Sequence, residues 1–128
     1  MKALYSIALI AALAAGNAYA ACTYPTPPDK LPDGATATRD EMLEGKKKVT
    51  EFDKAISEYN TCLQKEADEA IANLSSTITD EKERESKKAD IQKMADQKHN
   101  AAVEADEQLA ARFNEQLRAY NAKQKAKK

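Results

Sequence analysis

The stretch VTEFDKAISEYNTCL, residues 49–63, decides the fold, because its large apolar side chains recur at alternating spacings of three and four residues. Those side chains are Val49, Phe52, Ile56, Tyr59 and Leu63. The spacing places them in one stripe along an α-helix. Met42, Ala70 and Leu74 extend the stripe in both directions. We therefore predict a long amphipathic helix over about residues 39–74.

The start of this helix is marked by Thr38 and Glu41, which have the spacing of a capping box. Its end is marked by NLSSTIT, residues 73–79, which is rich in β-branched and small hydroxyl residues. Thr79 or Asp80 can then cap a following helix. Gly45 is the one weak point of the first helix, since glycine costs about 1 kcal/mol relative to alanine.

A second long helix is predicted over about residues 80–125, where the chain from residue 81 onward contains neither proline nor glycine. Two long helices joined by about five residues fold back as an antiparallel hairpin. The fold class is therefore all-α, with one helical unit over residues 39–128. The expected pairs across the hairpin are Leu63 with Ile91, Tyr59 with Met94 or Ala95, Phe52 with Ala102, and Met42 with Phe113.

In this register the second helix extends past the start of the first, and the overhang carries Leu117 and Tyr120. These residues are one helical turn apart, and apolar residues stacked in this way suggest a contact surface. We expect a second copy of the chain to cover them, which makes the protein a possible homo-oligomer. The competing interpretation is a monomer whose last two turns fray.

The first twenty residues have the order of a secretory signal peptide. Lys2 precedes an apolar run over residues 3–15, and Ala18-Tyr19-Ala20 follows as the cleavage motif. A run of this length is too short to span a bilayer, which needs roughly 20 apolar residues. We predict cleavage after Ala20 and a periplasmic or secreted protein that does not span the membrane. The alternative is a lipoprotein cut before Cys22, although Tyr19 stands where a lipobox usually has leucine.

Residues 21–38 form a proline-rich arm, because all four prolines of the chain lie there. Proline lacks a backbone N–H and restricts the residue before it, so the arm is expected to be extended. Cys22 in the arm and Cys62 in the first helix are the only cysteines. An even count in an exported chain predicts a disulfide between them. The arm of about 16 residues can stretch to roughly 50 Å, and the return along the helix is only about 35 Å.

Three segments resemble a group of small exported proteobacterial proteins: PDGATAT at 32–38, EMLEGKKKV at 41–49 and FDKAISEYNTCL at 52–63. The group shares a PDG-x-x-A arm, a methionine-containing helix start and a Tyr-x-x-Cys-Leu helix. The resemblance covers residues 22 to about 65. It implies the same arm-and-hairpin plan and a bacterial source, and it brings no catalytic residue to this chain.

Residues for catalysis or metal binding are sparse. The chain has three glycines, so a phosphate-binding loop is not expected, and it has no HExxH or CxxC motif. Its single histidine, His99, forms one Asp-x-x-His pair with Asp96, whereas a zinc site needs three or four ligands. We therefore predict no enzyme, no catalytic residue, no metal site and no cofactor.

Charge gives little indication of a partner, because lysine and arginine number 20 against 21 acidic residues. The near balance predicts no nucleic-acid partner. The lysine-rich tail NAKQKAKK, residues 121–128, either complements the helix dipole or makes a weak membrane contact. We expect a non-enzymatic exported interaction or structural protein with an unknown protein partner. The alternative is a periplasmic small-ligand or metal stress-binding protein.

Overall fold

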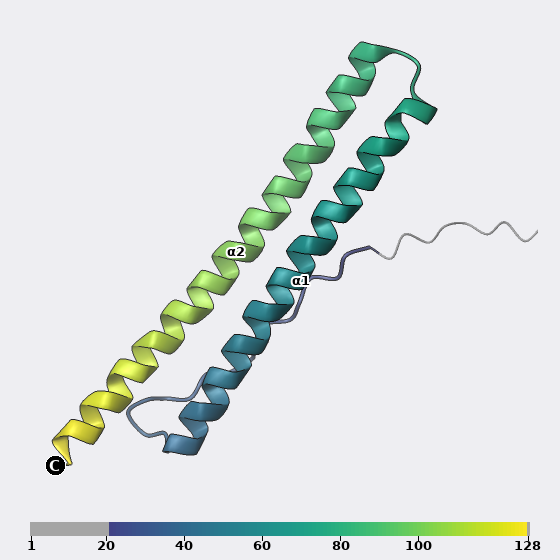
Figure 1. The fold of residues 1–128 in the computed structure, drawn as a ribbon. Helices are drawn as coiled ribbons and strands as arrows, with labels where there is room; N and C mark the ends of the chain where they lie inside the picture. Colours follow the sequence, from purple (N-terminus) through teal and green to yellow (C-terminus); the bar gives the residue numbers. More distant parts are fainter. Residues whose placement is uncertain (1–20, 128) are drawn as a thin grey trace, which may run out of the picture.

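Two long antiparallel helices form the protein (Figure 1). The computed structural model describes residues 21–127, and the expected signal peptide at 1–20 lies outside the described residues. Helix α1 spans Arg39–Thr77 and helix α2 spans Glu81–Ala126. The part of the chain that is described contains no strand, so the predicted all-α hairpin is confirmed.

Both helix starts are capped by the expected side chains. The Thr38 hydroxyl accepts a hydrogen bond from the Glu41 backbone N–H at 3.3 Å. The Glu41 carboxylate in turn accepts one from the Thr38 N–H at 2.7 Å, which confirms the capping box. Of the two candidates for α2, Asp80 is the cap, since its carboxylate accepts from the Glu83 N–H at 2.8 Å.

Helix α1 ends three residues later than predicted, because the hydroxyl-rich segment stays helical. The Ser75 hydroxyl donates to the Ala72 carbonyl at 3.1 Å. The hydroxyls of Ser76 and Thr77 both donate to the Asn73 carbonyl. Serine and threonine can bond back to carbonyls three and four residues earlier without leaving the helix. The helix therefore continues to Thr77.

The buried core occupies only the half of the hairpin farther from the turn. One cluster consists of Phe52, Ile56, Tyr59, Leu63, Ala102 and Leu109. A second consists of Ala37, Met42 and Phe113. In α1 the last buried residue is Ala67, and in α2 the first is Ala102. Every described residue from 68 to 101 is thus at least partly exposed.

The register of the hairpin agrees with the prediction at three levels. Met42 and Phe113 share a cluster, as do Phe52 and Ala102. Leu63 and Ile91 line the same small groove together with Ala95. Of the two residues expected opposite Tyr59, Met94 is 57% exposed and Ala95 is partly buried.

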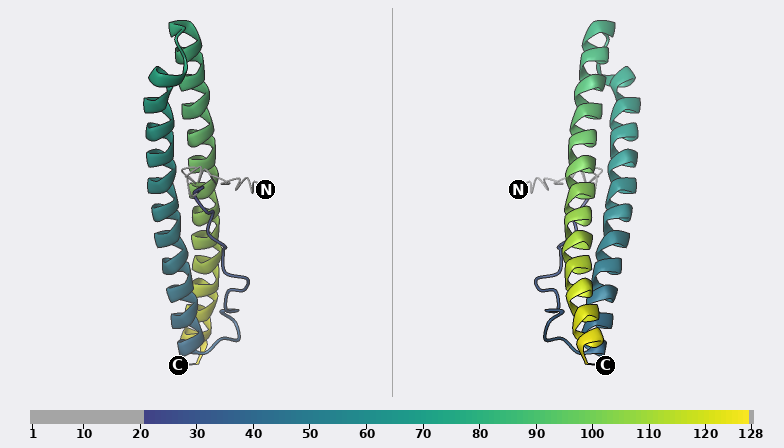
Figure 2. Two further views of the ribbon diagram at one scale, coloured as in Figure 1. Left: turned by 90° about the vertical axis from the view of Figure 1, so that its right-hand side faces the viewer. Right: turned by 90° about the vertical axis from the view of Figure 1, so that its left-hand side faces the viewer.

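The ring of Tyr59 packs against the arm. The Tyr24 ring meets the Tyr59 ring edge-on, with 5.3 Å between the ring centroids. The arm runs along one side of the hairpin near the C-terminal end of α2 (Figure 2). It returns to helix α1 through a disulfide between Cys22 and Cys62, whose Cα atoms are 5.8 Å apart. The predicted disulfide is therefore confirmed.

Candidate functional site

The arm contacts α1 where Pro32 lies against Gly45. A Cβ atom placed on Gly45 would lie 2.6 Å from both Cδ and Cγ of Pro32 and 3.0 Å from Cε2 of Phe113. Real Cβ atoms do not approach other heavy atoms so closely. The helix therefore needs a residue without a side chain at position 45 for the arm and α2 to meet there.

The same part of the arm also contacts α2. The Gly34 N–H donates to the Gln116 side-chain oxygen at 2.9 Å, and a Cβ on Gly34 would collide with the Gln116 backbone carbonyl. The Lys123 ammonium group donates to the Ala37 carbonyl at 2.9 Å. We call residues 32–37 the clasp, because this segment joins α1 to α2 at the open end of the hairpin.

The clasp is itself a tight turn organised by Asp33. The Asp33 carbonyl accepts from the N–H groups of Thr36 and Ala37 at 3.1 and 2.7 Å. The Asp33 carboxylate accepts from the Ala35 N–H at 2.9 Å. The sequence Pro32-Asp33-Gly34 is typical of a turn, but nothing in it indicates the contacts of this turn with both helices.

Residues 22–31 continue from the clasp toward the disulfide, and we call them the strap. Cys22 and Leu31 are partly buried against the larger core cluster. Tyr24 packs on Tyr59 and remains 44% exposed. In the described structure the strap makes no hydrogen bond, so packing and the disulfide alone hold it against the helices.

Leu117 and Tyr120 do not form one exposed surface. Tyr120 is partly buried against Ala37, Met42 and Phe113, and its ring lies 6.0 Å from the Lys123 ammonium group. Leu117 is 39% exposed. The clasp reaches α2 at this level, so Tyr120 has a contact within its own chain that the sequence analysis did not predict.

An open groove of about 790 Å³ lies between the helices around Asp53, Asn60, His99 and Asp106. Partial burial raises the pKa of Asp106, and the adjacent Asp53 carboxyl raises it further by hydrogen bonding and by charge repulsion. One side-chain oxygen each of Asn60 and Asp106 is buried without a hydrogen-bond partner in the protein. The expected register did not contain this pairing, because Phe52 opposite Ala102 puts residue 101, and not Asp106, at the level of Asp53.

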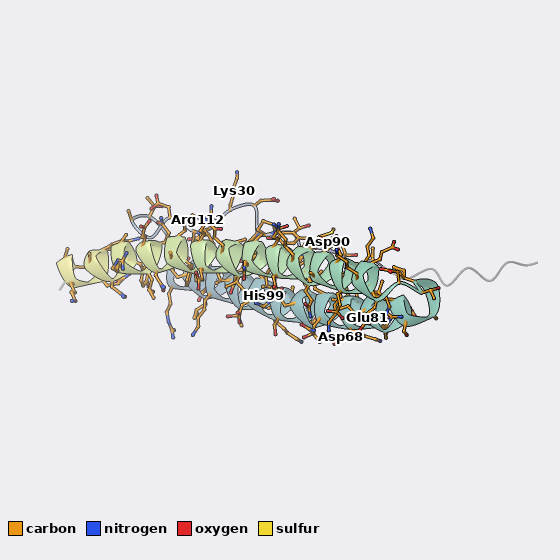
Figure 3. All side chains as sticks on the ribbon, turned by 90° about the horizontal axis from the view of Figure 1, so that it is seen from above. Lys30, Asp68, Glu81, Asp90, His99 and Arg112 are labelled. Atoms are coloured by element: carbon orange, nitrogen blue, oxygen red, sulfur yellow. A yellow bond between two sulfur atoms is a disulfide. The ribbon has the colours of Figure 1, made fainter. Side chains whose placement is uncertain are left out.

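Among the described residues, this groove does not bring together a set of side chains that could hold a metal ion. His99 is exposed on α2 (Figure 3). Within residues 21–127, no group of three or more histidine, cysteine or acidic side chains is placed to hold one metal ion. Both cysteines are in the disulfide. The groove therefore offers a carboxylate pair, and its lining also includes the hydroxyl residues Ser57 and Thr61.

The disulfide also bears on the compartment. A sulfur bonded to another sulfur cannot carry the thioether of a lipid anchor, so the Cys22 sulfur of the disulfide-bonded form carries no diacylglyceryl group. A disulfide is compatible with an oxidising compartment outside the cytoplasm. Among the described helices, none is both long and apolar enough to cross a bilayer.

The fold and its contacts define a class: an antiparallel helical hairpin closed at its open end by a disulfide-linked arm. No protein-family model, no curated protein and no solved structure matches the chain. The resemblance to small exported proteobacterial proteins therefore stays a prediction.

Proposed function

We propose that the protein is a non-enzymatic interaction or structural protein of the periplasm or the secreted fraction, and that it binds a protein partner through its helix surfaces. The observation that carries this proposal is the uneven burial along the hairpin. The half near the clasp has a packed core, whereas every described residue from 68 to 101 is at least partly exposed.

The exposed half still carries an apolar groove between the helices. Its apolar lining consists of Leu63, Ala67, Ala70, Ile91, Met94 and Ala95, and Glu66 and Lys98 complete it. Met94 is the most exposed large apolar residue of the described chain. Methionine is flexible and adapts to partners of different shape.

Charged residues explain why the two helices do not bury this half by themselves. Arg84 and Lys88 are the partly buried positions of α2 between the turn and Ile91. Their long side chains keep a charged end in water while the stems cover apolar surface. Arg84 also donates to the Ile78 carbonyl at 3.3 Å. The half near the turn is thus a continuous helix pair whose groove is available to a partner.

Photo-crosslinking in cells tests the proposal with two matched positions. A photoreactive residue is placed at Met94, which is 57% exposed, or at Leu43, which is 52% exposed but lies in the packed half. We expect a discrete crosslinked product from position 94 and little or none from position 43. Equal products from both positions, or none from either, would contradict a partner surface in the half near the turn.

The alternative function, binding of a small ligand or a metal in a stress response, has weaker support. Its best candidate is the groove at Asp53 and Asp106, and the described residues place only these two carboxyl groups in contact there. Calorimetric titration of the wild type and Asp106→Asn with zinc tests it directly. A saturable heat that the substitution removes would favour the alternative.

A further inference from the structure

The two parts of the arm are held by different interactions. The clasp carries the hydrogen bonds of Gly34 to Gln116 and of Lys123 to the Ala37 carbonyl, as well as its internal turn. The strap, residues 22–31, has none among the described residues. A cut of the disulfide would therefore remove the one strong connection of the strap and leave every hydrogen bond of the clasp in place.

We propose that the Cys22–Cys62 disulfide is a redox latch: a dithiol reductant opens it and releases the strap, while the clasp and the helical hairpin stay folded. One reductant thiolate attacks a sulfur of the disulfide and forms a mixed disulfide. The second reductant thiol then displaces the remaining cysteine. The protein disulfide gains two electrons and two protons, both cysteines end as thiols, and the reductant leaves as its own disulfide.

Release of the strap is favoured by the entropy of about ten backbone residues that the disulfide holds in place. The opposing interactions are few. Tyr24 is nearly half exposed although its ring packs on Tyr59, and Leu31 is only partly buried. Both cysteines are also partly exposed, so the disulfide lies within reach of an external thiol.

Retention of the hairpin is expected because its anchors lie outside the strap. Ala37, Met42 and Phe113 form a buried cluster that includes the clasp. The capping box at Thr38 begins α1 directly after the clasp. Leu31, the strap residue next to the clasp, also packs against this cluster, but its three buried members and the capping box lie outside the strap. We therefore expect both features to persist when the latch opens.

The consequence of opening is a longer apolar groove. The strap covers the side of the core cluster that carries Tyr59. Leu63 belongs to that cluster and also lines the groove that continues past Ala67 to Ile91. Removal of the strap joins the two regions along one side of the hairpin. The latch rests on the contacts of the arm alone and does not depend on the proposed function.

Limited trypsin digestion tests the latch at a single peptide bond. Lys30 is the only lysine or arginine in residues 21–38, and its side chain points away from the helices (Figure 3). The mature protein is digested in its oxidised form and after reduction with dithiothreitol and alkylation. We expect cleavage after Lys30 to be at least about tenfold faster in the reduced form, with unchanged far-ultraviolet circular dichroism.

A Cys22→Ser variant is the matched control, because it lacks the disulfide without carrying an alkyl group. It should show the same fast cleavage after Lys30, together with loss of the Tyr24–Tyr59 ring contact in nuclear Overhauser spectra. Equal cleavage rates in the oxidised and reduced forms would overturn the proposal. Loss of the helical signal on reduction would also overturn it, because the disulfide would then hold the whole fold rather than the strap.

Discussion

Pro32 lies against Gly45 in space that a side chain at position 45 would fill. From the helix propensity scale alone, Gly45 is a defect in α1. In the folded protein it is the position where the arm, α1 and α2 come together, since the nearest side-chain atoms belong to Pro32 and Phe113. A residue that weakens the isolated helix thus permits a close tertiary contact between the arm and α1.

Gly45→Ala is therefore expected to destabilise the protein despite the better helix propensity of alanine. The propensity gain is about 1 kcal/mol, whereas overpacking of a close contact typically costs about 1–3 kcal/mol. We expect a net loss of about 1 kcal/mol in the free energy of unfolding, measured by urea denaturation followed by circular dichroism.

Pro32→Ala in the same background provides the control, because it removes the Cγ and Cδ atoms that the new methyl group meets. The double variant should recover part of the loss. If the Gly45→Ala variant were more stable than the wild type, the clasp would not pack as closely on α1 at position 45 as described.

The disulfide is expected to stabilise the protein by less than its loop length implies. A cross-link between residues 40 positions apart contributes about 4 kcal/mol in the chain-entropy model, which assumes an unchanged native state. If reduction also frees the strap in the native state, that state regains conformational entropy. The free energy of unfolding then falls by less than the chain-entropy model implies. Urea denaturation of oxidised and reduced protein should therefore differ by clearly less than about 4 kcal/mol. A difference at or above that value would indicate that the strap stays ordered after reduction.

The parts of the structure that could be predicted from the sequence depend on local patterns. The alternating spacing from Val49 to Leu63 determines the buried face of α1, and Thr38 and Glu41 determine its start. The disulfide followed from the presence of only two cysteines. Each of these inferences needs only a few neighbouring residues or a count, and each is confirmed.

The parts that could not be predicted depend on tertiary contacts. The clasp reaches α2 because Gly34 lets the arm approach the backbone of Gln116, and a glycine in a turn has the same sequence signature whether or not a helix lies beside it. The late end of α1 depends on whether hydroxyl groups bond back to the helix or cap the next one. The contact between the rings of Tyr24 and Tyr59 joins the arm to α1, and no local pattern near either residue indicates it.

Asp106 is expected to make stability depend on pH. Because its pKa is raised in the folded state, the folded protein holds this proton more tightly than the unfolded chain does. The carboxyl group therefore opposes folding above its folded pKa. This opposition is relieved as the pH falls through the folded pKa toward the ordinary value of 3.8.

Asp106→Asn removes the repulsion with Asp53 and should increase the free energy of unfolding at pH 7 by less than about 1 kcal/mol. The gain should shrink as the pH falls through the folded pKa of Asp106. Asp90→Asn is the matched control, since Asp90 is an exposed aspartate on the same helix. Thermal unfolding of the three proteins between pH 4 and 7 checks this, and a gain that is independent of pH would contradict the carboxyl pair.

Leu117 and Tyr120 are expected to respond differently to substitution, because Tyr120 packs against the cluster that includes Ala37 of the clasp, whereas Leu117 is exposed. Tyr120→Ser removes a partly buried ring from the cluster of Ala37, Met42 and Phe113. A typical destabilising substitution costs about 0.5–3 kcal/mol, and we expect the cost of removing a partly buried ring to lie near the middle of that range. Leu117→Ser changes a side chain that is 39% exposed, so the monomer should lose no more than about 0.5 kcal/mol.

Sedimentation separates packing from self-association at this end of the hairpin. If a second copy covers Leu117, wild-type protein sediments as a dimer at high micromolar concentration and Leu117→Ser shifts it toward the monomer. Tyr120→Ser should lower the melting temperature whether or not the protein dimerises, because its ring contacts the same chain's clasp. If the wild type is monomeric and Leu117→Ser leaves its melting temperature unchanged, Leu117 is not part of a contact surface. Tyr120 would then act only through its contact with the clasp.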